Sequence, residues 1–145
     1  MRAFIITIIV ILGITAAASA QTVETMTVSV GQQKTVGKGD LKLSFVKLID
    51  DSRCPANAKC VWAGNAKIKI TVSRPGNAKR TFELNTGLEP RSVTVFGYEI
   101  KLTNVAPYPG TNAKADPGRP VAKPQTATFT ITKLRRPMPK QLGRY

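Results

Sequence analysis

The sequence predicts an all-β fold: a single antiparallel β-sandwich, immunoglobulin-like or similar, with seven to eight short strands and one local disulfide. Three observations lead to this class. Apolar residues alternate with lysine, threonine and serine in short runs, and turn residues bound each run. No segment keeps a helical period. The two cysteines of the chain lie close together near its middle.

Residues 1–20 have the pattern of a secretory signal peptide. Arg2 gives a positive start, residues 3–17 are mostly apolar, and residues 18–20 read Ala-Ser-Ala, a sequence that signal peptidase accepts. The apolar run is shorter than the roughly 20 residues of a membrane-spanning helix. We therefore expect a protein that is exported, periplasmic or secreted, with no transmembrane segment after cleavage before Gln21.

The mature chain is expected to form one domain, because cleavage leaves 125 residues (145 minus 20). We place the sandwich at residues 21–136 and a basic, flexible C-terminal tail at 137–145. Five prolines and two glycines fall within residues 107–124. Proline donates no hydrogen bond to a strand ladder, so this segment is expected to be a long exposed connection.

The strands are predicted from alternation alone, and they fall at residues 24–30, 41–48, 66–73, 79–84, 93–102 (one or two strands) and 127–131. The apolar phase slips at Phe45-Val46, which predicts a β-bulge. The sequence Pro75-Gly76-Asn77 predicts a tight turn that joins two strands into a hairpin. Gly97 marks the break inside residues 93–102.

The cysteine segment predicts a stapled loop. Cys54 and Cys60 have five residues between them, and export to an oxidising compartment favours a disulfide. The alternative, a zinc site, is weaker because the chain has two thiols and no histidine. Asp51 and Ser52 are expected to form a turn in which Arg53 can pair with either preceding aspartate; the alternative is that the acidic pair coordinates a cation or marks a binding loop. We expect Trp62 to pack at the edge of the core, with an exposed aromatic anchor as the alternative.

Catalysis is not expected. Without histidine, the chain lacks the usual general base and the common nucleophile–histidine pairs. Its eight carboxylates are scattered, and no spacing points to an acid–base pair, although Asp51, Glu83, Glu89 or Glu99 could meet in space. The prediction is therefore a protein that is not an enzyme, with no cofactor and no metal site.

Positive charge is the strongest indication of function. The chain has 22 Lys and Arg against 8 Asp and Glu, a net charge of +14. Such a field attracts anionic partners. The alternative is a lysine-rich surface that only keeps the protein soluble. Aromatic residues do not interleave with the basic strands, so no specific nucleic-acid binding is expected. The candidate binding residues are Arg53, Trp62, Lys67, Lys69, Lys133, Arg135, Arg136 and Lys140.

A resemblance to known proteins is carried by the segment Asp51-Ser52-Arg53-Cys54-Pro55, followed by Cys60, Trp62 and Gly64. It resembles the D-S-R-C-P-x4-C-x-W-x-G motif of small exported bacterial β-domain proteins, a functionally uncharacterised group. The likeness spans roughly residues 30–134. It implies an exported β-domain with a local disulfide, and it gives no activity or binding residues to transfer. The high positive charge is not a feature of that group.

The sequence therefore favours a monomeric, non-catalytic binding or accessory module. In this hypothesis its basic strand faces and tail dock on an anionic envelope polymer, a lipid headgroup or an acidic protein. The alternative is an inhibitor or regulator of an extracytoplasmic enzyme that acts through the rigid Cys54–Cys60 loop.

Overall fold

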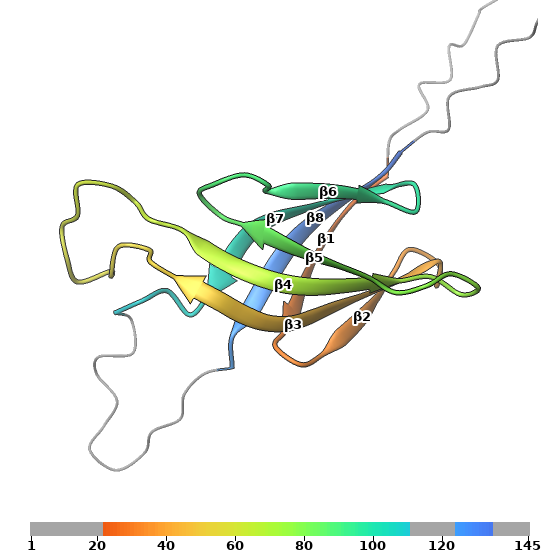
Figure 1. The fold of residues 1–145 in the computed structure, drawn as a ribbon, viewed down its shortest axis with the longest axis horizontal. Coiled ribbons are helices and arrows are strands. Elements are labelled where there is room, and N and C mark those ends of the chain that lie inside the picture. The colour runs from red at the N-terminus through yellow and green to blue at the C-terminus, as the bar shows by residue number, and fades with distance from the viewer. Residues whose placement is uncertain (1–21, 111–123, 135–145) are drawn as a thin grey trace, which may run out of the picture.

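Two four-stranded antiparallel sheets pack against each other in a computed structural model that describes residues 22–110 and 124–134 (Figure 1). The first sheet has the order β1-β8-β7-β6 and the second β2-β3-β4-β5. The strand bounds are β1 Val23–Ser29, β2 Gln33–Val36, β3 Leu41–Asp51, β4 Ala66–Ser73, β5 Arg80–Asn85, β6 Ser92–Val95, β7 Tyr98–Ala106 and β8 Thr126–Lys133. The predicted all-β sandwich with a local disulfide is confirmed.

The core lies between the sheets and is built by period-two alternation. In β4, Ala66, Ile68, Ile70 and Val72 are buried, whereas the residues between them face outward. The same pattern in β8 buries Ala127, Phe129 and Ile131. Side chains at alternate positions of a strand point to the same face of the sheet. This arrangement explains why the apolar alternation in the sequence located most of the strands.

The strand pairing bears out the predicted irregularities. The register between β3 and β4 shifts between Phe45 and Lys47, where the apolar phase slips in the sequence. Strands β4 and β5 form the predicted hairpin, and its turn is closed by the Asn77 N–H, which donates to the Arg74 carbonyl at 3.0 Å. The β6–β7 turn contains Gly97, at a φ of 82°. Strand β2, which has one buried residue, was not predicted.

The two ends of the sandwich carry different structures. The loop that contains both cysteines, the β5–β6 connection and residues 106–110 lie at one end, as the left side of Figure 1 shows. The beginning of β1 and the end of β8 lie at the other end, where the Lys133 N–H donates to the Thr22 carbonyl at 3.2 Å. The predicted tail at 137–145 and most of the proline-rich connection lie outside the described residues.

Candidate binding surface at the cysteine loop

Residues 52–65 join β3 to β4 and form the cysteine loop. The Cys54–Cys60 disulfide closes its outer part, with 5.8 Å between the two Cα atoms, as predicted. At its base, the Ser52 N–H donates to the Asn65 carbonyl at 2.8 Å, and the Cys54 N–H donates to the Ala63 carbonyl at 2.9 Å. The loop therefore leaves and re-enters the sheet through paired backbone groups.

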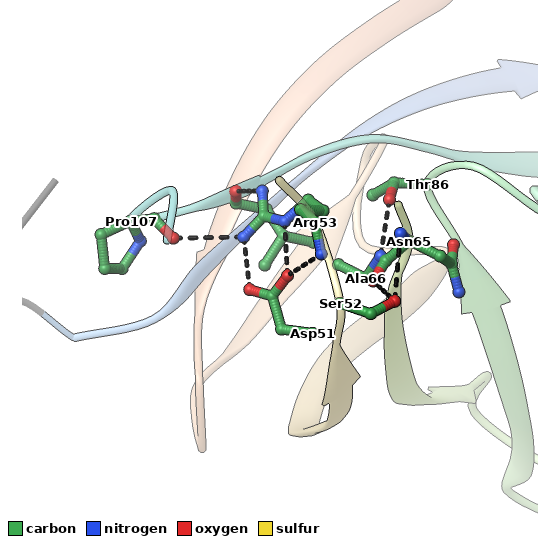
Figure 2. Close-up of polar contacts among 8 residues, drawn as sticks. Asp51, Ser52, Arg53, Asn65, Ala66, Thr86 and Pro107 are labelled. Atoms are coloured by element: carbon green, nitrogen blue, oxygen red, sulfur yellow. Dashed lines mark hydrogen bonds and ion pairs between the residues drawn. The ribbon is translucent and has the colours of Figure 1, made fainter. Parts of the chain in front are cut away.

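Arg53 anchors the cysteine loop from within, as Figure 2 shows. The residue is 6% exposed, and its guanidinium forms a two-point contact with Asp51: Nε to Oδ1 at 2.8 Å and Nη2 to Oδ2 at 2.7 Å. Nη1 donates to the Val105 carbonyl and Nη2 to the Pro107 carbonyl, the latter at 3.2 Å. The predicted pairing with a preceding aspartate is confirmed.

The buried position of Arg53 limits it as a binding residue. Its guanidinium lies 4.5 Å from the centroid of the Tyr108 ring and faces the end of β7 and the residues that follow it. The carbonyls of that chain lie where the strand ladder ends, and the guanidinium supplies N–H donors to them. We therefore assign Arg53 to the frame of the site rather than to its outward surface.

Two buried asparagines tie the cysteine loop to the β5–β6 connection. Asn65 Nδ2 donates to Asn85 Oδ1 at 2.9 Å, and the Gly87 N–H donates to Asn65 Oδ1 at 2.9 Å. Asn85 Nδ2 donates in turn to the Glu89 carbonyl at 3.1 Å. The Thr86 hydroxyl accepts the Ala66 N–H at 2.9 Å (Figure 2). Neither asparagine was predicted as a site residue, because the bonds from Asn65 to Asn85 and to Gly87 join positions 20 or more apart in the chain.

Close backbone contacts within the cysteine loop and between it and the β5–β6 connection require glycine. Gly64 has a φ of 75°, and a Cβ there would lie 1.9 Å from the Ser52 carbonyl oxygen. A Cβ on Gly87 would lie 2.6 Å from the Gly64 carbonyl oxygen. Both distances are far below van der Waals contact. A side chain at Gly64 would push apart the two arms of the cysteine loop, and one at Gly87 would push the β5–β6 connection away from that loop. This contact supplies a structural reason for the glycine that ends the cysteine-tryptophan motif.

Trp62 is exposed, and the prediction that it packs at the edge of the core is wrong. Its exposed fraction is 74%, and that of the adjacent Val61 is 96%. Residues 55–63 are all exposed, because the cysteine loop extends beyond the ends of β3 and β4 (Figure 1). Trp62 therefore fits the alternative prediction, an exposed aromatic anchor.

Two clefts meet at Gly64 and Gly87, and Trp62 lines one of them. The larger has a volume of about 650 Å³ and lies between the cysteine loop and the β5–β6 connection, with Trp62, Leu88 and Arg91 among its lining residues. The smaller, of about 190 Å³, includes Arg53 and Tyr108. Both clefts are lined by Gly64 and Gly87. Leu88, which is 62% exposed, and Arg91 were not predicted as site residues.

The predicted basic residues do not form one cluster. Lys67 and Lys69 lie on the outer face of the second sheet, where their Nζ atoms lie 2.9 and 3.6 Å from the Glu83 carboxylate. The hydrogen bond from Lys67, with the charges of Lys67 and Lys69, lowers the pKa of Glu83 below its ordinary value. Arg135, Arg136 and Lys140 lie outside the described residues.

Lys133 lies at the other end of the sandwich, close to Asp40 and Tyr98. Its Nζ is 3.6 Å from Asp40 Oδ2 and 5.7 Å from the centroid of the Tyr98 ring. The Tyr98 hydroxyl donates to Asp40 Oδ2 at 3.0 Å, and this bond, with the Lys133 charge, lowers the pKa of the Asp40 carboxyl. A cleft of about 300 Å³ opens there.

Within residues 22–110 and 124–134, no group of three or more His, Cys, Asp or Glu side chains is placed to hold a metal ion. Over the same residues, no helix is long and apolar enough to cross a membrane. Compared with known proteins, the chain matches no protein-family model, no curated protein and no solved structure.

Proposed function

We propose that this protein is a non-catalytic, exported binding module that docks on an acidic protein through its cysteine loop. The observation that carries the proposal is the exposure of Trp62 on a loop that is closed by a disulfide and anchored at its base. Tryptophan is among the residues that most often contribute the largest share of binding energy in protein interfaces. A rigid loop that presents it outward is suited to that role.

The rigidity of the frame supports this role in a second way. Arg53 fixes the beginning of the cysteine loop to the end of β7, and the Asn65–Asn85 pair fixes its end to the β5–β6 connection. A surface that is ordered before binding loses less conformational entropy when a partner arrives. The indole and its neighbours would therefore lose little freedom on binding.

Charge supports an acidic partner. Lys67 and Lys69 alternate with buried residues of β4, and Lys47 lies directly opposite Lys69 in the register. Directly opposed residues in an antiparallel pair share a face, so these ammonium groups gather on the outer surface of the second sheet. Glu83 offsets part of this charge. With a chain charge of +14, the field attracts an acidic partner and speeds the encounter.

An inhibitor of an extracytoplasmic enzyme would use the same surface. Such a protein differs from a docking module only in the identity of its partner. It requires the captured protein to be an enzyme whose activity falls when the cysteine loop binds.

A second candidate function is docking on an anionic envelope polymer or lipid headgroup through the lysines of the second sheet. The observation that favours it is the same cross-strand juxtaposition of Lys47 and Lys69. This candidate requires neither Trp62 nor the disulfide, and its binding is expected to weaken strongly with salt.

A salt-titrated pull-down from the source cell envelope tests the two candidates. It compares the protein produced from the full sequence with Trp62→Ala and with Lys42→Ala/Lys47→Ala, two exposed lysines of β3. Under the proposal, the wild type captures one identifiable acidic protein. Trp62→Ala weakens that capture about thirtyfold, the usual effect of losing an interface hot spot. Capture that is unchanged in Trp62→Ala, lost in the lysine variant and abolished by salt would instead establish the second candidate.

A further inference from the structure

The larger cleft has two apolar walls that come from different segments. Trp62 belongs to the cysteine loop and Leu88 to the β5–β6 connection, and their exposed fractions are 74% and 62%. Gly64 and Gly87 also line the cleft, at the point where the backbones of the two segments come into close contact. A volume of about 650 Å³ falls within the range of pockets that hold ligands of moderate size.

The β5–β6 wall of the cleft is held by backbone and side-chain hydrogen bonds. Gly87 is bonded to Asn65 through its N–H, and its carbonyl accepts a hydrogen bond from Arg91 Nη2 at 2.9 Å. The Asn85 N–H donates to the Pro90 carbonyl at 2.9 Å. The β5–β6 connection is thus fixed on either side of Leu88 by bonds within the protein, so this side of the cleft needs little ordering when a partner binds.

Arg91 provides a cationic group beside the apolar walls. Its Nε lies 3.8 Å from Glu89 Oε1, a distance too long for a good hydrogen bond, and the Glu89 side chain is 83% exposed. Such an exposed ion pair contributes little free energy, so an incoming carboxylate can replace Glu89 at the guanidinium at small cost, while Glu89 Oε2 keeps its hydrogen bond from the Arg91 N–H at 3.0 Å. The bond from Nη2 to Gly87 keeps the guanidinium at the cleft. Arginine binds carboxylates well because its planar fork offers parallel donors.

The chemistry of the cleft indicates what occupies it. Trp62 and Leu88 suit a large apolar side chain, and Arg91 suits a carboxylate next to it. Val61, next to Trp62 in the chain, is also exposed, so a partner longer than one side chain would find further apolar surface outside the cleft. Lys67 lies two positions after Asn65, a lining residue, so further acidic groups would meet positive charge on the adjoining sheet.

From these contacts we infer that the cleft binds an extended, acidic protein segment. One aromatic or leucine side chain of that segment inserts between Trp62 and Leu88, and a neighbouring carboxylate pairs with Arg91. The inference rests on the proposed function and deepens it, because it specifies which part of the acidic partner the cysteine loop recognises.

The fluorescence of Trp62 tests this inference, since it is the only tryptophan in the chain. The probe is the synthetic peptide acetyl-Asp-Asp-Phe-Asp-Asp-amide, titrated into the protein produced from the full sequence. Burial of the indole against the phenylalanine is expected to give a saturable blue shift. A peptide with alanine in place of phenylalanine should bind about tenfold more weakly, because little apolar area is buried. A peptide with lysines in place of the aspartates should give no saturable shift.

Protein variants separate the two parts of the cleft. Leu88→Ala should weaken binding of the phenylalanine peptide about tenfold, because apolar contact is lost. Arg91→Gln should weaken binding of the phenylalanine peptide about fivefold. It should also narrow the difference in affinity between the aspartate and lysine peptides. Lys38→Gln, an exposed substitution at the other end of the sandwich, is the matched control and should leave binding unchanged.

Several results would overturn the inference. One is the absence of a fluorescence shift with the phenylalanine peptide, and another is an equal affinity for the alanine peptide. A third is an equal loss of peptide affinity in Lys38→Gln and Arg91→Gln. A blue shift that depends on protein concentration without peptide would show that a second copy of the chain fills the cleft. If these peptide results fail while capture of the acidic protein still requires Trp62, the cleft assignment falls and the proposed function stands. If capture does not require Trp62, the proposed function itself falls.

Discussion

Arg53 and Asp51 meet edge to edge at the end of β3, with Nε 2.8 Å from Oδ1 and Nη2 2.7 Å from Oδ2. The same guanidinium reaches the carbonyls of Val105 and Pro107 at the end of β7. One side chain therefore joins the two sheets at the end where the cysteine loop leaves the sandwich. Its role is structural, and it holds the frame from which Trp62 projects.

Removal of this arginine is expected to destabilise the fold. Arg53→Met would leave the largely buried Asp51 carboxylate without its partner and two carbonyls without their donor. Breaking a buried ion pair on one side costs about 3–5 kcal/mol. Asp51 keeps some contact with water, so we expect a loss of about 3 kcal/mol in the free energy of unfolding, measured by urea denaturation. Lys42→Ala, on the exposed face of β3, should change it by no more than about 0.5 kcal/mol. Equal midpoints for the two variants would contradict the assigned role of Arg53.

Gly64 is expected to tolerate no side chain. Gly64→Ala would place a Cβ 1.9 Å from the Ser52 carbonyl oxygen, at a φ of 75°. Gly76→Ala is the matched control, because Gly76 has a φ of 74° and a Cβ there would have no atom within 4 Å. The control bears only the backbone strain of a left-handed residue, about 1–2 kcal/mol. We expect Gly64→Ala to lose at least about twice as much stability, since the loop must also move. Similar thermal midpoints in the two variants would show that the close contact is unimportant.

Alternation of apolar and polar residues predicted most of the sandwich because each strand buries one face. The hairpin between β4 and β5, the bulge near Phe45 and the break at Gly97 were also evident from local sequence. Strand β2 was missed, since its four residues bury only Val36 and carry little apolar signal. Its place in the sheet depends on pairing with β3.

The binding surface was less predictable, because it is assembled from segments distant in sequence. The disulfide and the pairing of Arg53 with an aspartate follow from short spacings, and both were predicted. The exposure of Trp62 was not, since its immediate neighbours do not determine which way it faces. Leu88 and Arg91 become site residues only through the contact of Gly87 with Gly64 and Asn65. No local pattern encodes such a contact.

The disulfide is expected to matter more for binding than for folding. A ring closed at a sequence separation of 6 contributes about 2 kcal/mol by chain entropy. Cys54→Ser/Cys60→Ser should therefore remain folded, with a free energy of unfolding lower by about that amount in urea denaturation. Trp62 should gain freedom, which fluorescence anisotropy measures as a lower value in the folded state. An unchanged anisotropy in the double variant would show that the loop base alone holds the indole.

Acid is expected to weaken the other end of the sandwich through Asp40. The Tyr98 hydroxyl, followed by the Lys133 charge, lowers the pKa of Asp40 below its ordinary value of 3.8. A carboxyl whose pKa is lower in the folded state adds stability above its unfolded pKa, and this stability is lost as pH falls through the folded value. Wild-type stability should therefore decline below about pH 4, with Glu83 contributing to the same decline because its pKa is also lowered.

Tyr98→Phe removes the hydrogen bond to Asp40, so the difference between its urea midpoints at pH 7 and pH 3 should be smaller than that of the wild type. Glu83→Gln should reduce this difference independently, because Glu83 contacts Lys67 and Lys69 rather than Tyr98. If Tyr98→Phe lost as much stability between the two pH values as the wild type, the Tyr98–Asp40 bond would not contribute to acid sensitivity.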